Sequence, residues 1–514
     1  MTTSVFLMNM GWVLLLVNWT AEWIGTGKDF RKERLARLCD NRLLWAFFLL
    51  MVLHLVALLW SSNWHYGLDD IRKKLPLLVV PMAILTSRPL QRRAWGNILG
   101  CYVGAVVVAS VVGLVRYFTV PDLPYRAIVP FISHIRFSLN ICLVVALLSW
   151  QGLKMLRNHP SGRRWLAACY LTGVVYFLFY LFLLQSYTGM VVLFVLVAVL
   201  LVAYWKRMDN KRLRNSLFVA WLVALIAVVG VTLYFVNDYY RLRPLALQPL
   251  EACTANGNAY SHECDGFVEC GNYVNNYVCE KELREQWPLV SDMPLDSITA
   301  TGYPVLPALI RYLNAMECTK DSAGVACLTS RDVRAIEKGI ANPVYLKHPS
   351  VRKMYDIMLF EYESYRCYRS VRDFTMLQRF ELWRSGWAVF GKHILWGTGT
   401  GDVVDECHAQ LRASGSPLAG TAKHVHNQYI TFLITFGIVG FVLLVCAFVL
   451  GVRQNRLWRR FPFLVVLTVS LISFFTEDTL ETLAGCMFVA FFWSYFGVSC
   501  TFNGNDIDKH AIES

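Results

Sequence analysis

Apolar runs of bilayer length recur along this chain, and they constrain its fold more than any other feature. A helix needs about 20 mostly apolar residues to cross the hydrocarbon core of a membrane. The composition agrees, because 56% of the 514 residues are hydrophobic and 17% are charged, with a mean hydropathy of +0.42. We predict an all-α polytopic membrane protein with about 11–12 transmembrane helices. The predicted spans are 4–24, 43–60, 75–86, 98–115, 137–152, 165–184, 190–205, 216–236, 428–449, 461–476 and 483–502.

Basic residues set the predicted orientation, since short loops rich in lysine and arginine stay in the cytoplasm. They gather in alternate loops, at 28–37, 88–93, 154–164, 206–214 and 453–460. The net charge of +13 is then topological, and nucleic acid is not an expected partner. The predicted domains are an N-terminal transmembrane bundle at 1–236, an extracytoplasmic insert at 237–427, and C-terminal transmembrane helices with a short cytoplasmic tail at 428–514.

Cysteine usage is consistent with an insert in an oxidising space. Eight of the 15 cysteines lie in the insert, and that even number predicts up to four disulfides of open connectivity. A zinc cluster is the alternative, but no paired CxxC spacing favours it. The eight are Cys253, Cys264, Cys270, Cys279, Cys318, Cys327, Cys367 and Cys407. The Cys-rich stretch 253–327 either selects a ligand or braces the insert.

The segment 375–406, "TMLQRFELWRSGWAVFGKHILWGTGTGDVVDE", combines a helical pattern with a glycine-rich stop. Arg379, Trp383 and Trp387 are spaced four apart and share one helix face. The "GTGTGD" that follows includes Gly399 and Asp402. It lacks the preceding strand and the lysine of a phosphate-binding P-loop. The favoured interpretation is a tight turn that glycine permits.

Several cationic side chains lie on the predicted outer side of the membrane. The preference of basic loops for the cytoplasm does not explain them. Cations at membrane depth usually mark a polar ligand, because an unpaired guanidinium there is expensive. A diphosphate-linked lipid would explain both the charge and the location, since arginine binds phosphate oxygens in bidentate fashion. The alternative is that each arginine contacts lipid headgroups or snorkels to water. The residues are Arg116, Arg126, His134, Arg136, Arg241, Arg243 and Arg379.

His426 and Asn427 stand directly before a predicted membrane helix, in "KHVHNQYITFLITFGIVG" (423–440). With an ordinary pKa of about 6.5, a histidine at that depth can take a proton from an alcohol at neutral pH. His54 is expected to be an interhelix hydrogen-bonding residue instead. We expect His393, His408 and His424 to be surface residues or to stand behind the residues that contact a ligand.

These features together resemble the O-antigen ligase and O-antigen polymerase superfamily of bacterial envelope glycosyltransferases. The resemblance rests on "RFELW" with Arg379 and Trp383, on "GTGTGD" at 397–402, and on "HNQYITFLITFGIVG" with His426 and Asn427. It covers about 375–445 in detail, and the multi-helix layout with one large outer loop extends it to the whole chain. The chain is most similar to an O-antigen ligase.

The resemblance implies a metal-independent, inverting glycosyltransferase of the GT-C-like membrane type without a cofactor. Its expected partners are an undecaprenyl-diphosphate-linked glycan as donor, the lipid A core oligosaccharide as acceptor, and membrane lipids. The implied location is the bacterial inner membrane, with the active site on the periplasmic side. An O-antigen polymerase, a protein O-oligosaccharyltransferase and, from a different class, a lipid-linked glycan transporter or flippase remain alternatives, as does a scaffold without enzymatic activity.

The resemblance also suggests roles for individual residues. His426 and Arg379 are the expected catalytic residues. Arg136, His134 and one of Arg241 or Arg243 are expected to bind the donor diphosphate. Asn427, Trp383, Gly399 and Asp402 are expected to support them.

Two observations complicate this assignment. Many family members have a Ser-Arg pair where this chain has Ser186 and Tyr187, so a donor contact at position 187 is in doubt. No outer Asp-x-Asp pair suggests a metal site. Glu477, Asp478 and Glu481, in a short outer loop, are a conceivable exception, but the favoured interpretation is a solvated turn.

Overall fold

The structure is a computed structural model of the whole chain. It describes residues 5–87, 91–120, 123, 125–158, 164–205, 210–263, 265–299, 301–346, 350–371, 375–421, 424–454 and 456–498. By internal contacts the chain forms two compact units, one made of 1–215 and 379–514 and the other of 216–378. The bounds of these units differ from those of the predicted domains. The predicted domains are defined by membrane topology and stay a prediction.

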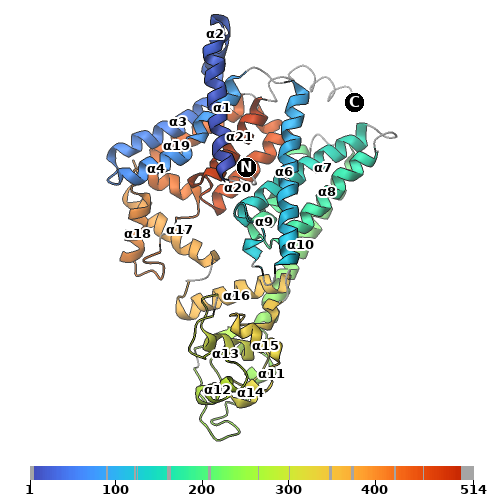
Figure 1. Cartoon of the computed structure of the whole chain (residues 1–514), viewed down its shortest axis with the longest axis vertical. Coiled ribbons are helices and arrows are strands. Elements are labelled where there is room, and N and C mark those ends of the chain that lie inside the picture. Colours follow the sequence, from blue (N-terminus) through green and yellow to red (C-terminus); the bar gives the residue numbers. More distant parts are fainter. Residues whose placement is uncertain are drawn as a thin grey trace. The chain divides into compact units, whose positions relative to one another are not determined.

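The described residues of the first unit form helices joined by loops and turns, without a strand (Figure 1). Its N-terminal part contains α1 (Val5–Gly25), α2 (Lys28–Asp40), α3 (Arg42–Ala57), α4 (Trp64–Lys74), α5 (Pro76–Thr86), α6 (Arg92–Thr119), α7 (His134–Asn158), α8 (Arg164–Leu183) and α9 (Tyr187–Tyr204). Its C-terminal part contains α17 (Thr375–Lys392), α18 (Val403–Ala413), α19 (Gln428–Gln454), α20 (Phe461–Thr476) and α21 (Leu483–Val498). Short 3₁₀ turns lie at Leu58–Trp60, Tyr125–Ala127, Leu457–Arg459 and Thr479–Glu481.

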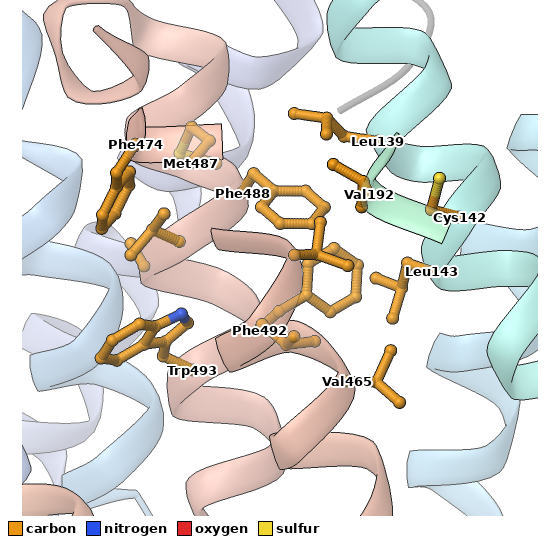
Figure 2. Packing of buried hydrophobic residues seen from close by; sticks show 14 of the residues in the cluster. Leu139, Cys142, Leu143, Val192, Val465, Phe474, Met487, Phe488, Phe492 and Trp493 are labelled. Carbon is orange, nitrogen blue, oxygen red and sulfur yellow. The ribbon is translucent and has the colours of Figure 1, made fainter. Parts of the chain in front are cut away.

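Helices far apart in the sequence pack against each other in this unit. Helix α3 runs along α19, α5 along α21, and α20 contacts α7 and α9. Figure 2 shows the resulting core, in which Phe488 and Phe492 of α21 face Leu143 of α7 and Val192 of α9. Such buried apolar contacts hold the C-terminal helices against the N-terminal bundle, which fixes the loops that join them.

The second unit carries most of α10 (Lys211–Tyr240) and a small mixed subdomain. Its elements are α11 (Pro244–Leu247), β1 (Val268–Glu269), β2 (Asn272–Tyr273), α12 (Glu280–Gln286), α13 (Val305–Ala315), α14 (Ser322–Ala326), α15 (Ser330–Glu337) and α16 (Val351–Tyr368), with 3₁₀ turns at Trp287–Leu289 and Pro343–Leu346. The two strands pair antiparallel. Trp287, Leu309 and Tyr312 are fully buried at the centre of its apolar core.

The predicted all-α membrane architecture is confirmed. All eleven predicted spans are helical in their described residues, and seven helices are long and apolar enough to cross a membrane: Arg42–Trp60, Arg93–Thr119, His134–Leu156, Arg164–Leu183, Tyr187–Tyr204, Lys211–Tyr240 and Gln428–Gln454. Phe461–Thr476 and Leu483–Val498 are shorter apolar helices. The exact number of spans stays a prediction.

The predicted disulfides are not confirmed. Seven of the eight insert cysteines are described and carry free thiols, while Cys264 lies outside the described residues. Cys318 and Cys327 contact each other through their thiols.

Candidate active site

Two segments of the first unit meet around His426. One is the stretch 424–428, which leads into α19, and the other is the turn 477–481 between α20 and α21. Nδ1 of His426 lies 3.3 Å from Oε2 of Glu477 and 3.3 Å from Oδ1 of Asp478. His426 has a backbone φ of 54°. That left-handed conformation is unusual for a residue with a side chain and is a form of strain often found at functional sites.

The acidic pair changes the protonation of His426. Burial of the ring alone would lower its pKa, but the facing Asp478 and Glu477 raise the pKa to about 9. Burial would raise the pKa of Asp478, yet the contact with His426 leaves it below its usual value. At neutral pH the site therefore contains an imidazolium facing carboxylates rather than a free base.

Two buried polar atoms of His426 and Asp478 lack a complete hydrogen bond. No described residue completes a hydrogen bond with Nδ1 of His426 or with the buried Oδ2 of Asp478. Nδ1 of His424 lies 3.9 Å from that oxygen. The two ion pairs at 3.3 Å still engage Nδ1 of His426, so Oδ2 of Asp478 is the atom that has capacity for a further ligand.

Arg379 joins the group from α17, because its Nη2 forms an ion pair with Oε1 of Glu477. Close packing fixes α17 here: Nε1 of Trp383 donates to the backbone oxygen of His426 at 3.4 Å, and Gly386 faces Ile430 so closely that an added Cβ would lie 2.7 Å from its Cγ2. Arg379 and His426, both predicted from motifs, thus contact the same carboxylate, that of Glu477.

Asn427 has a structural contact of its own. Its side-chain oxygen accepts hydrogen bonds from the backbone N–H groups of Tyr429 at 3.0 Å and Ile430 at 3.2 Å. This caps the N-terminus of α19, where such donors lack partners inside the helix. The cap fixes the direction in which the chain leaves His426.

The glycine-rich segment fills a break in α19. Gly437 has non-helical dihedrals (φ 65°), which interrupts the helix. Thr398 and Gly399 donate their N–H groups to the oxygens of Ile434 at 2.7 Å and Thr435 at 3.1 Å. On the other side of the break, Ile438 donates to Ile394 at 2.7 Å. Non-helical backbone at membrane depth needs such partners.

Gly399 and Asp402 hold the backbone of the glycine-rich loop against the α3–α4 turn. A Cβ on Gly399 would lie 2.4 Å from Oγ of Ser61. The carboxylate of Asp402 accepts from the N–H groups of Ser62 at 2.7 Å and Asn63 at 2.8 Å. The loop thus joins α17, α19 and the α3–α4 turn, in agreement with the tight turn favoured from the sequence.

His134 and Arg136 begin α7. The charges of Glu477 and Asp478 act on Arg136, and those of Glu477 and Arg379 act on His134. Both side chains are half-buried. Three of the residues predicted to be cationic, His134, Arg136 and Arg379, therefore lie within electrostatic range of Glu477.

A second charge cluster contacts the turn 477–481 through Glu481. Nζ of the buried Lys74 donates to Oδ1 of Asp70 at 2.6 Å and to Oε2 of Glu481 at 2.7 Å. Gln428 donates to Oε1 of Glu481 at 3.1 Å and accepts from the N–H of Leu480 at 2.7 Å. Burial and the nearby Glu481 raise the pKa of Asp70 to about 8, while Lys74 holds the pKa of Glu481 below its usual range. Gln428, two residues after His426, thus ties α19 to the acidic turn.

Arg241 and Arg243 lie in the second unit. Nη2 of Arg243 is 3.0 Å from Oδ1 of Asp238, and its backbone N–H donates to Gly271 at 2.9 Å. Arg241 is exposed. Their predicted share in a diphosphate site stays a prediction.

The expectation of a solvated turn at 477–481 was wrong. Asp478 is 5% exposed, and Glu481 lies in the buried cluster with Lys74. A usable signal was present, because three acidic residues follow an apolar helix with no basic residue among them. In such a place carboxylates need partners from elsewhere in the fold.

His426, Glu477 and Asp478 also offer three donor atoms within 4.8 Å of one another, a geometry that could hold a metal ion. Imidazole and carboxylate donors suit several divalent cations. Arg379 already neutralises one of these carboxylates. The predicted metal independence stays a prediction.

Comparison with known proteins identifies the same region. Residues 344–445 match the sequence model of a protein family described as O-antigen ligase. No curated protein shows significant similarity to the chain. The matched segment contains Arg379, Gly399, Asp402, His426 and Asn427, but ends before the acidic turn. The chain is thus a multi-pass membrane protein whose residues 344–445 are similar to the O-antigen ligase family, which confirms the predicted resemblance to that superfamily.

Proposed function

We propose that this protein transfers a glycan from undecaprenyl diphosphate to an acceptor hydroxyl, most simply as an O-antigen ligase acting on the lipid A core oligosaccharide. The proposal places the protein in the bacterial inner membrane with its site on the periplasmic side. The observation that carries it is that Arg379 and His426, both inside the region that matches the family, meet at Glu477 of the following acidic turn.

Arg379 and Arg136 bind the diphosphate in this proposal, with His134 beside them. Cleavage of the sugar–diphosphate bond leaves the electron pair on the departing phosphate oxygen, and fixed cations stabilise that charge. When the diphosphate binds, Arg379 turns to it and leaves Glu477 without its guanidinium. The carboxylate of Glu477 is then free to face the acceptor hydroxyl while the donor is in place.

The acceptor oxygen then attacks the anomeric carbon from the face opposite the diphosphate, which inverts the configuration. Glu477 receives the proton of the hydroxyl, and the new glycosidic bond replaces the sugar–phosphate bond. His426, kept protonated by the carboxylates, orients the reacting groups. This assigns His426 the orienting role rather than that of the free base, because its pKa is about 9.

The direct test is transfer of glycan from a purified polyprenyl-diphosphate donor by the reconstituted protein. We expect the His426→Ala variant to lose about 10²–10⁴-fold in rate while its melting temperature shows that it is folded. His408→Ala is the matched control, since His408 lies on α18 outside the acidic pair. A folded His426→Ala variant with the parental rate would refute the assignment.

Ligase and polymerase differ in the acceptor. A deletion strain that accumulates lipid-linked polymer and lacks long glycan on the lipid A core supports the ligase. A single repeat unit left on the core indicates the polymerase instead.

A further inference from the structure

Helix α17 and the turn after it expose several large apolar side chains. Phe380 is 56% exposed and Trp387 53%, and the exposed fractions of Ile394, Leu395 and Trp396 are 50%, 59% and 62%. The opposite face of α17 is buried, with Leu382 and Val389 packed inside the unit. Soluble surfaces rarely carry large apolar residues in one contiguous patch.

This face continues a surface that contacts lipid. The oxygens of Ile394 and Leu395 accept hydrogen bonds from Ile438 at 2.7 Å and Val439 at 3.4 Å, in the broken part of α19. Helix α19 is apolar and long enough to span a membrane, and its Val442 and Leu443 are 48% and 51% exposed. A bilayer around that stretch of α19 would also reach the neighbouring turn at 394–396, because the two are hydrogen-bonded to each other.

The composition of the face fits the interfacial zone rather than the hydrocarbon centre. Tryptophan and phenylalanine prefer the boundary between headgroups and acyl chains, and basic residues reach from there to phosphates. Arg384 and Lys392 stand exposed on the same helix. Arg379 lies on the side of α17 that faces Glu477.

We propose that Phe380, Trp387 and the turn 394–396 form a membrane-docking face whose occupant is the acyl-chain region of the bilayer. Docking anchors α17 in the interface and holds Arg379 at the depth of lipid phosphates. The face contacts ordinary bilayer lipid, so it does not depend on which glycan the protein transfers.

Photolabelling tests this in the full-length protein. The protein is reconstituted into liposomes of phosphatidylcholine that carries a diazirine on one acyl chain, and labelled peptides are mapped by mass spectrometry. We expect label at Phe380, Trp387 and 394–396, comparable to that on 442–450 of α19. Leu289, which is 75% exposed and lies outside the candidate spans, serves as the unlabelled reference. Since these liposomes hold no polyprenyl lipid, the label reports bilayer lipid alone.

Label on 442–450 without label on 380–396 would overturn the proposal, because protein or water would then cover the face. A matched pair of variants sharpens the result. We expect Leu395→Asp to reduce label on 394–396 several-fold and to leave label on 442–450 unchanged, whereas Leu289→Asp changes neither. Equal label on 394–396 in Leu395→Asp and the parent would also count against docking.

Discussion

Two buried charge clusters in this protein follow opposite designs. In the second unit, Nε and Nη2 of Arg311 donate to the two carboxylate oxygens of Glu269, each at 2.8 Å, and Asn342 adds a bond of 3.2 Å. In the first unit, His426 and Asp478 face each other across 3.3 Å, but Nδ1 of His426 and Oδ2 of Asp478 complete no hydrogen bond with any described residue. The hydrogen bonds of the Arg311–Glu269 cluster are saturated, whereas those of the His426–Asp478 cluster are not.

The difference separates a structural role from a functional one. A saturated buried pair has little capacity left for a ligand, and breaking it leaves an uncompensated charge. An unsaturated group keeps electrostatic capacity that a ligand can use. We therefore expect changes at the two clusters to affect different measurements.

Glu477→Gln should have the largest effect. It keeps the shape of the side chain but removes the proposed base, so we expect the transfer rate to fall about 10²–10⁴-fold. The thermal midpoint of the purified variant should stay close to that of the parent. Asp69→Asn on α4 is the control, because Asp69 pairs only with the exposed Arg72 and Lys73 among the contacts described. An unchanged rate in Glu477→Gln would remove the base from the mechanism.

Arg311→Met should act on stability instead. It leaves Glu269 buried without its cation, and we expect a loss of about 3–5 kcal/mol in the free energy of unfolding of that unit. Denaturant unfolding followed by circular dichroism measures this. Arg284→Met, at a fully exposed ion pair with Asp296, should leave the unfolding curve unchanged. Equal curves for all three proteins would show that the saturated pair does not stabilise the fold.

Arg379→Lys should have an intermediate effect on the donor. Lysine keeps the charge but cannot form the two parallel bonds to phosphate. We expect KM for the donor to rise about 10-fold or more, which corresponds to about 1.4 kcal/mol, with a smaller change in kcat. Steady-state kinetics at varied donor concentration separates the two. An unaltered KM would place the diphosphate elsewhere.

The smallest expected effect is a pH dependence of stability from His426. Its pKa is about 9 in the fold and about 6.5 in an unfolded chain, so the stabilising proton is fully bound below pH 6.5 and lost as pH rises through 9. Because a third of the ring is exposed, we expect only about 1 kcal/mol. The melting temperature of the parent should therefore fall more between pH 6.5 and 9.5 than that of His426→Gln. Parallel curves would mean that the acidic pair does not hold the proton on His426.

Individual residues show how far the sequence predicted the site. Arg379 and His426 were found because each stands in a recognisable local pattern, and the structure places both on the same carboxylate, that of Glu477. Glu477 and Asp478 were taken for solvent-exposed residues, since a short polar turn between apolar helices looks the same whether it is hydrated or buried. Gln428, Lys74 and Asp70 gave no local signal, because their contacts with 480–481 join segments distant in the chain.

The sequence by itself determined the class of fold. Apolar runs of bilayer length specify membrane helices, and that property depends only on neighbouring residues. It also determined which side chains are charged and which glycines permit unusual turns. The tertiary structure alone decided what those charges do. The pKa of His426 and the pairing of Arg379 with Glu477 arise from burial and from partners that packing brings together across 98 residues of chain.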